Sequence, residues 1–358
     1  MKGTLLLLAG ATILTVSSCK KERKEDPVLD FNGKQSAMLT TFADNIATQS
    51  YNDINNAATD LQASIEALYS VRDNNSLTEA QIRWKTLRDI WEQTEAYYTF
   101  GPGKDSRYND QIDTWPTSAY SLDSLLEKTG YDLSVSELQK LPSSFRGLHA
   151  MEWVLFGKDG MKNASNITGR QGDYMRSLAA DLKSNCQALY FAWSTAPTNY
   201  AITVKNAGNG SEAYKTKQAA ILTMVDALSS LCGNISDYKL ELPFILADSN
   251  SVESPYADYS VTDIKNNLLG LRNVYQGKYR AYTGVGLTDL VKEKNQSLDN
   301  KILQRIDSSI IAANAFTVSL DKSIFVQRSN IGALMVAVDS LQSTVKNDLR
   351  NFVLDNIK

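Results

Sequence analysis

Cysteine, histidine and proline are all scarce in this chain of 358 residues, and the scarcity of each excludes a type of site or structure. The single histidine excludes a zinc peptidase of the His-Glu-x-x-His kind, because that motif needs two histidines on one helix. The 37 basic and 40 acidic residues give a net charge of -3, so neither sign is in excess. There is therefore no global electrostatic attraction to nucleic acid or to an anionic membrane surface, and we expect no nucleic-acid partner.

The N-terminus has the pattern of an export signal. Lys2 precedes an apolar run over residues 5–16, which is too short to span a bilayer but typical of a signal peptide. Val16-Ser17-Ser18-Cys19 then has the aliphatic, small, small, cysteine order of a bacterial lipobox. We predict a signal peptide over residues 1–18, a lipidated Cys19 and a charged tether over residues 19–33. This places the protein in the cell envelope, bound to a membrane through its lipid; the alternative is an ordinary signal peptide followed by a chance cysteine.

Only Cys186 and Cys232 remain once Cys19 is assigned to the lipid. An exported protein can form disulfides, so the two could pair. If the helices around them form a simple hairpin that turns near residue 202, however, Cys232 lies about 20 Å beyond the position opposite Cys186. That separation is too large for a disulfide, and we predict two buried free thiols.

The hydrophobic pattern predicts an all-α protein. Apolar residues recur at spacings of three and four, no stretch shows sustained apolar alternation, and only seven prolines interrupt the chain. The glycine-rich segment 157–169 is a connection, and we place a boundary there between an N-terminal helical domain, 34–160, and a C-terminal helical-bundle domain, 161–358. The expected helices are 35–72, 77–99, 118–128, 143–156, 171–194, 212–232, 258–278, 297–316 and 328–356.

One expected helix carries the sole histidine beside a glutamate. His149 and Glu152 are three residues apart, one turn apart on a helix, and can share a proton or a metal ion. Glu152 projects from an apolar stripe, and Gly147 is small enough for another segment or a ligand to approach the backbone. The alternative is a core histidine hydrogen-bonded to a buried glutamate. Two ligands do not complete a metal site, so any metal here needs distant carboxylates or solvent.

A second helix buries a carboxylate among aromatic residues. Glu95 lies within the apolar face that Trp84 and Trp91 define. An unpaired buried carboxylate costs several kcal/mol, so Glu95 must meet a cation, a group of donors or a metal. Arg88 is the local candidate for that partner, and the functional alternative brings Glu95 to His149 across a helix interface.

Two further acids could bind a ligand or cap a helix. Asp113 lies in a loop that ends at Pro116, and it could serve a site or cap the helix expected near residue 118, with capping slightly favoured. Asp263 follows Ser260 in the pattern of a helix start, so we expect a capping role for it too.

These segments together resemble the imelysin family. The resemblance rests on Gly147-x-His149-x-x-Glu152, on residues 91–102 with their Phe-Gly-Pro ending, on Ile112-Asp-Thr-Trp-Pro116, and on residues 253–277. It covers essentially the whole chain after the signal peptide, and the combination is more specific than any one motif.

The resemblance implies two helical-bundle domains packed side by side, with the Gly-x-His-x-x-Glu segment near a cleft between them. It also implies export and an association with iron acquisition. The leading hypothesis is a lipid-anchored metal-binding component of an uptake system with partner proteins. Its expected ligand is iron, with zinc and calcium as alternatives. The expected ligating residues are His149, Glu152, Glu95 and Asp113, and Arg88, Gly147 and Asp263 are secondary candidates.

Two other functions remain open at this stage. The family name comes from a peptidase classification, and a metal-dependent peptidase would use Glu152 as general base and His149 as metal ligand. A cell-surface module that binds a peptide or glycan would need aromatic cleft walls, for which Trp115 and Trp153 are the candidates.

Overall fold

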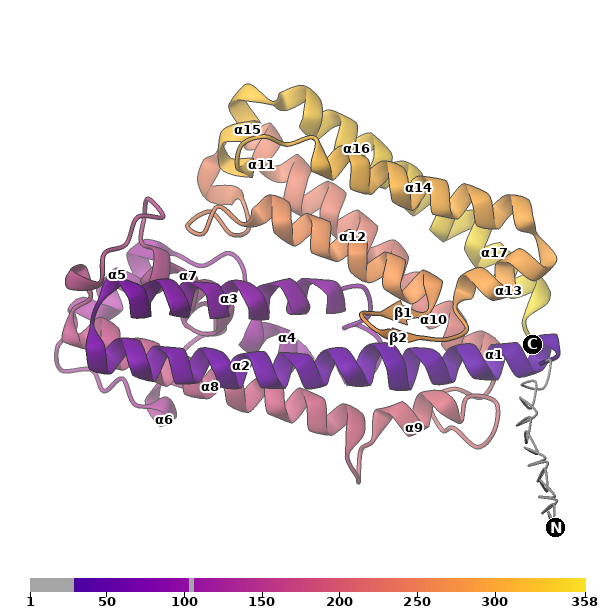
Figure 1. The fold of residues 1–358 in the computed structure, drawn as a ribbon, viewed down its shortest axis with the longest axis horizontal. Coiled ribbons are helices and arrows are strands. Elements are labelled where there is room, and N and C mark those ends of the chain that lie inside the picture. Colours follow the sequence, from indigo (N-terminus) through magenta and orange to yellow (C-terminus); the bar gives the residue numbers. More distant parts are fainter. Residues whose placement is uncertain (1–28, 103–105) are drawn as a thin grey trace, which may run out of the picture.

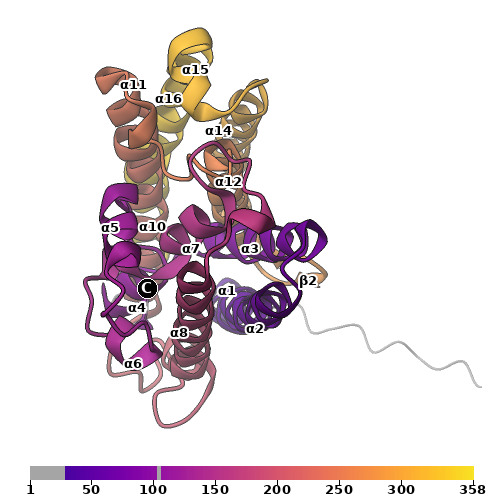
Figure 2. The same ribbon diagram turned by 90° about the vertical axis from the view of Figure 1, so that its left-hand side faces the viewer.

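Helices arranged in two side-by-side bundles make up most of this computed structural model, which describes residues 29–102 and 106–358 (Figure 1). The predicted signal peptide and Cys19 lie outside the described residues. Figure 2 shows the two bundles end on, with α2, α3, α7 and α8 of the first below α12, α14 and α16 of the second.

The first bundle is built on a single long helix. α1 (Phe31–Thr40) continues through a π-helical segment, η1 (Thr41–Ala47), into α2 (Thr48–Val71). α2 packs along α3 (Asn74–Thr94) and α8 (Gly169–Ser194), and α7 (Gly147–Phe156) contacts both α3 and α8. Capping boxes start two of these helices, from Asp73 before α3 and from Thr168 before α8, so their first turns are fixed by local sequence.

The second bundle contains α10 (Lys217–Gly233), α12 (Ser260–Gln276), α14 (Gln296–Asn314) and α16 (Arg328–Ser343). Two of its helices run on through π-helical turns. η5 (Asn234–Glu241) joins α10 to α11 (Leu242–Leu246), and η7 (Thr344–Leu349) joins α16 to α17 (Arg350–Asn356). Each π-helical turn changes which face of the helix the following residues occupy.

Shorter elements connect the long helices. They are α4 (Ser106–Ile112), α5 (Ala119–Glu127), α6 (Val135–Leu138), η3 (Ser143–Phe145), η4 (Ala164–Asn166), α9 (Tyr200–Lys205), η6 (Ser249–Ser251), the antiparallel strands β1 (Lys278–Tyr279) and β2 (Tyr282–Thr283), α13 (Leu287–Lys294) and α15 (Leu320–Val326).

The two bundles meet where α3 lies against α12. Gly270 allows the contact, because a Cβ at this position would lie 2.1 Å from the carbonyl oxygen of Gln93. The close approach brings α12 side chains to the α3 backbone, and the Asn267 amide donates to the Glu92 carbonyl oxygen at 2.9 Å. The interface is therefore tight where both helices carry polar residues.

The all-α fold of two bundles is confirmed. Two expected helix ends were wrong: the helix expected to reach residue 99 ends at Thr94, and the one expected to stop at 232 runs on to Leu246. Cys186 and Cys232 are buried and free, as predicted. The domain boundary near residue 160 stays a prediction; α8, which follows it, packs along α2 of the first bundle.

One helix among the described residues, Lys217–Leu246, is long and apolar enough to cross a membrane by length and composition. Its most apolar window is 61% buried within the protein. Core helices of this kind pass the same test, so the helix is explained by its position in the second bundle.

Candidate functional site

A left-handed glycine at the start of α7 brings the loop that carries Asp113 against the histidine helix. Gly147 has φ = 76°, and a Cβ on it would lie 2.4 Å from the carbonyl oxygen of Ile112. Glycine is the residue that adopts this conformation without strain. Asp113 follows Ile112 directly, so the close approach at Gly147 places its carboxylate beside His149.

His149 lies between two carboxylates and is 2% exposed. Its Nδ1 is 3.2 Å from Glu152 Oε2, and its Nε2 is 3.1 Å from Asp113 Oδ1. The other oxygen of Glu152 accepts hydrogen bonds from the backbone N–H groups of Tyr256, at 2.9 Å, and Ala257, at 2.8 Å. Glu152 is thereby fixed, and it orients the imidazole so that Nε2 faces Asp113.

Arg88 on α3 is fully buried and joins the histidine pair to the second bundle. Its guanidinium forms ion pairs with four carboxylates, those of Glu92, Asp113, Glu253 and Asp263. Asp113 also accepts a hydrogen bond from Trp91 Nε1 at 2.7 Å, and Asp263 accepts one from the Ser254 hydroxyl at 2.6 Å. One cation thus holds together acids from α3, the Asp113 loop, the segment before α12 and α12 itself.

Lys239 is the second buried cation, and it comes from η5 of the second bundle. Its Nζ lies 2.8 Å from carboxylate oxygens of Glu92, Glu95 and Glu253, and it donates to Asn267 Oδ1 at 3.0 Å. The Asn267 amide in turn donates to Glu92 and Glu95. We refer to these ten residues as the acid–histidine cluster: Arg88, Glu92, Glu95, Asp113, His149, Glu152, Lys239, Glu253, Asp263 and Asn267.

Burial and the neighbouring charges shift the pKa values of the acids and of the histidine in this cluster. Burial raises the pKa of Glu92 and of Asp263 to about 8, although the charge of Arg88 opposes this shift at both carboxyl groups. Burial also opposes ionisation of Asp113, but Arg88 and His149 outweigh it and hold the pKa of Asp113 well below its usual range. Burial and Arg88 act against protonation of His149, whereas Asp113 and Glu152 favour it and raise the pKa of the imidazole to about 10.

Two overlapping sets of side chains have the geometry to hold a metal ion. The first is Asp113, His149 and Glu253, and the second is Glu92, Glu95, Asp113 and Glu253; within each set the donor atoms lie within 4.8 Å of one another. The set that includes His149 suits iron or zinc, and the set of four carboxylates also suits calcium. Within the described part of the chain, His149 Nε2 and Glu253 Oε2 are buried without a hydrogen bond, although each lies near a charged partner. These two atoms are suitably placed to ligate an ion.

A cavity of about 370 Å³ connects the cluster to solvent. Four members of the cluster line it: Glu95, Asp113, Lys239 and Glu253. Trp115, which the sequence proposed as a cleft wall, also lines this cavity. Trp153 does not, since it packs on Tyr256 at 4.8 Å between ring centroids and donates to Asp123. A ligand therefore reaches the cluster from the side of Asp113 and Glu253.

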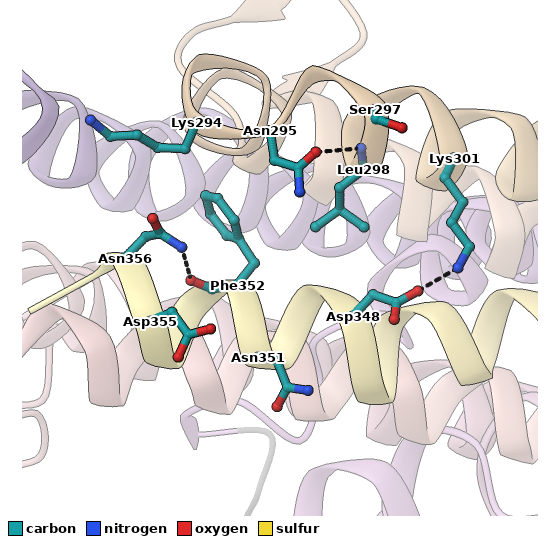
Figure 3. Close-up of a pocket in the computed structure, with 10 residues that line it drawn as sticks. All are labelled: Lys294, Asn295, Ser297, Leu298, Lys301, Asp348, Asn351, Phe352, Asp355 and Asn356. Carbon is teal, nitrogen blue, oxygen red and sulfur yellow. Dashed lines mark hydrogen bonds and ion pairs between the residues drawn. The ribbon is translucent and has the colours of Figure 1, made fainter.

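A larger cavity, of about 590 Å³, lies elsewhere, between α14 and α17 (Figure 3). Several of its polar side chains already form ion pairs or hydrogen bonds with neighbouring helix residues. Lys301 pairs with Asp348 at 2.6 Å, and Asn295 Oδ1 accepts from the N–H of Leu298 to cap α14. It shares no lining residue with the acid–histidine cluster, and no group of metal-ligating residues was found there among the described residues.

The structure brings six of the site residues named from sequence together in this cluster: Arg88, Glu95, Asp113, His149, Glu152 and Asp263. Gly147 lies beside it, against Ile112, and Cys19 lies outside the described residues; several roles differ from those expected. Asp113 does not cap α5, whose cap is Ser118, and Asp263 forms no helix-capping hydrogen bond; both capping predictions were wrong, because each acid pairs with Arg88 instead. Arg88, the local alternative as partner of Glu95, does not pair with it; Lys239 takes that place. Whether Glu152 and Glu95 ligate a metal stays a prediction.

Sequence reasoning missed Glu92, Lys239, Glu253 and Asn267. Glu92 had a usable signal, because it lies four residues after Arg88 and so one helical turn away. Lys239 lies in the part of the helix that was not expected, and Glu253 lies between η6 and α12 in a segment without periodicity.

Replacing Gly147 by alanine is expected to lower the free energy of unfolding by about 2–4 kcal/mol, the sum of left-handed strain and of the clash with Ile112. Chemical denaturation measures the loss. Gly130→Ala is the matched control, since a Cβ there meets nothing within 4 Å. Equal stability of the two variants would show that the Asp113 loop does not depend on the glycine.

A two-bundle helical protein with a buried acid–histidine cluster at the bundle interface is the class that fold and site define. The imelysin family model matches residues 47–345, and the chain belongs to this family. It is 26% identical over 288 residues to iron-regulated protein A of Synechococcus elongatus, an alignment that covers 78% of this chain and 76% of that protein.

Two solved structures share the fold. The crystal structure of a putative iron-regulated protein A precursor from Parabacteroides distasonis superposes with a TM-score of 0.80 at 21% identity, covering 91% of this chain and 96% of that one. An imelysin-like protein from Psychrobacter arcticum gives a TM-score of 0.72 at 15% identity, with 90% and 95% coverage.

Proposed function

We propose that this protein binds a metal ion, with iron as the expected ion, at Asp113, His149 and Glu253, as a lipid-anchored component of an uptake system in the cell envelope. The observation that carries the proposal is the convergence of these three donors within 4.8 Å, with Asp113 and Glu253 on the wall of a cavity open to solvent. The name of the Synechococcus relative, iron-regulated protein A, supports iron. The lipobox at Val16-Ser17-Ser18-Cys19 supports the anchor.

The role of each residue follows from its contacts. Asp113 and Glu253 offer carboxylate oxygens on the cavity side, and His149 offers Nε2. Glu152 acts through the histidine, because it holds Nδ1 and so directs Nε2 toward the ion. Arg88 keeps Asp113 and Glu253 ionised, since its charge favours the anionic form of both.

The position of Glu152 favours binding of an ion over peptidase chemistry. A general base must reach the proton that it removes. Glu152 is fully buried, is absent from the cavity wall, and uses one oxygen for two backbone N–H groups and the other for His149. These contacts suit an orienting residue better than a base.

Titration calorimetry with ferrous, ferric, zinc and calcium ions tests the proposal. We expect binding by the unmodified protein and an affinity at least about tenfold lower for His149→Ala and for Glu253→Gln. Affinity should rise between pH 6 and pH 9, because an incoming ion must displace the proton of His149, whose pKa is about 10. The released protons are counted by repeating the titration in buffers of different ionisation enthalpy.

The exposed Glu212→Gln variant is the control for removal of one acid, and its affinity should match that of the unmodified protein. Thermal unfolding of each variant without metal separates lost binding from lost folding. Identical traces for the unmodified protein and for folded His149→Ala would remove the metal site.

A further inference from the structure

A second, apolar cavity adjoins the acidic one. It has a volume of about 450 Å³, and Trp115 and Asn234 line both cavities. Beyond these two shared residues, the apolar cavity is lined by Pro116, Tyr238 and Leu242, with Asn250 and Ser251 at its polar side. Both volumes lie in the range of sites that hold small organic molecules.

The walls of the apolar cavity are in position without a ligand. The Trp115 indole N–H donates to the carbonyl oxygen of Val252 at 3.2 Å, which fixes the plane of the ring. Tyr238 and Leu242 are four residues apart on the continuous helix formed by η5 and α11, so they share one face. Their side chains are 59% and 40% exposed, and large apolar groups left uncovered together in this way often mark a binding surface.

The acidic cavity places carboxylate groups next to these apolar walls. Its ionisable wall residues include four acids, Glu95, Asp110, Asp113 and Glu253, against one lysine, Lys239. In the described residues, every hydrogen bond and ion pair of the Glu95 carboxylate uses Oε2, which leaves Oε1 available to a donor in the cavity. Such a wall attracts a cation and repels an anion.

We propose that the two cavities form one binding site for an organic cation, an amine attached to an aromatic or branched aliphatic group. The ammonium group would lie in the acidic cavity beside Glu95, and the apolar group would lie between Trp115, Tyr238 and Leu242. Burial of the ring supplies the affinity and the carboxylates supply the selection for positive charge. The amine can belong to a free small molecule or to the N-terminus of a peptide with an apolar first residue. The inference does not depend on the proposed metal.

Calorimetry of the whole protein with three small probes tests the two halves of the site. We expect 2-phenylethylamine to bind at least about tenfold more tightly than 2-phenylethanol, which lacks the charge, and than ethylamine, which lacks the ring. The peptide Phe-Gly-Gly and its N-acetylated form separate the two sources: binding of the free peptide alone assigns the site to peptide N-termini, and binding of phenylethylamine alone assigns it to free amines.

Variants on the exposed helix face decide whether the apolar cavity is used. Tyr238→Ser combined with Leu242→Ser should weaken phenylethylamine binding by about tenfold, since most of the apolar contact is lost. Ile245→Ser is the matched control, because Ile245 is 68% exposed and lies on the same helix but lines neither cavity. The affinity of this variant for phenylethylamine should stay within about twofold of that of the unmodified protein. The proposal would be overturned if phenylethanol bound as tightly as phenylethylamine, if the double variant and Ile245→Ser changed the affinity equally, or if no probe bound. None of these outcomes would affect the result of the metal titration.

Discussion

Arg88→Met is expected to lower the free energy of unfolding by about 3–5 kcal/mol, because it leaves four buried carboxylates without their shared cation. The loss should increase with pH. Without Arg88 the pKa values of these carboxyl groups rise, so the folded state holds protons that the unfolded state has released above about pH 4–5. A folded state that binds more protons loses stability as pH rises.

Urea denaturation at pH 5 and pH 8 measures this effect. Arg83→Met is the matched control, since Arg83 lies on the same helix and pairs with Glu79, but its side chain is 41% exposed. The control should change stability by no more than about 0.5–1 kcal/mol at either pH. If Arg88→Met lowers the free energy of unfolding no more than Arg83→Met does, or if its loss becomes smaller toward pH 8, Arg88 does not stabilise the four carboxylates.

Lys239→Met should give the second largest loss in the free energy of unfolding, and added metal should reverse that loss. The substitution removes the cation shared by Glu92, Glu95 and Glu253, so in chelator-treated buffer we expect a loss of about 3 kcal/mol. Lys239 lines the acidic cavity whereas Arg88 does not, so an ion from solvent can take its place. An ion at about a hundred times its dissociation constant restores about 2.7 kcal/mol.

Thermal unfolding with chelator and with millimolar calcium or manganese measures the recovery. The shift in Tm on adding metal should be larger for Lys239→Met than for the unmodified protein. Arg88→Met should not recover to the same extent, which separates a vacated cation site from a general response to salt. Lys301→Met, which breaks a half-exposed pair with Asp348, should show neither loss nor recovery. Equal metal shifts in all four proteins would contradict the prediction.

The sequence was sufficient for the helical class, most of the long helices and six of the ten residues of the cluster. His149, Glu152, Glu95 and Asp113 were identifiable because each is polar within an apolar pattern, and a buried charge must find a partner. Which partner each one finds depends on where other helices lie, and spacing along one helix does not determine that. Arg88 illustrates the limit: it faces four acids, of which only Glu92 is on its own helix.

The residues that were missed belong mainly to the second bundle. The π-helical turn of η5 changes the face on which Lys239 lies, so a regular 3.6-residue period does not place it. Glu253 is held by its ion pairs with Arg88 and Lys239, and no local pattern identifies it. Asn267 reaches Glu92 only because Gly270 lets α12 approach α3.

The cluster joins the two bundles, and this has a consequence for how they are held together. α3 and α7 supply Arg88 and His149 from one side, and η5 and α12 supply Lys239 and Asp263 from the other. A change of charge at this interface alters the forces between the bundles, so loss or gain of a charge in the cluster changes how firmly α3 and α12 hold the two bundles together.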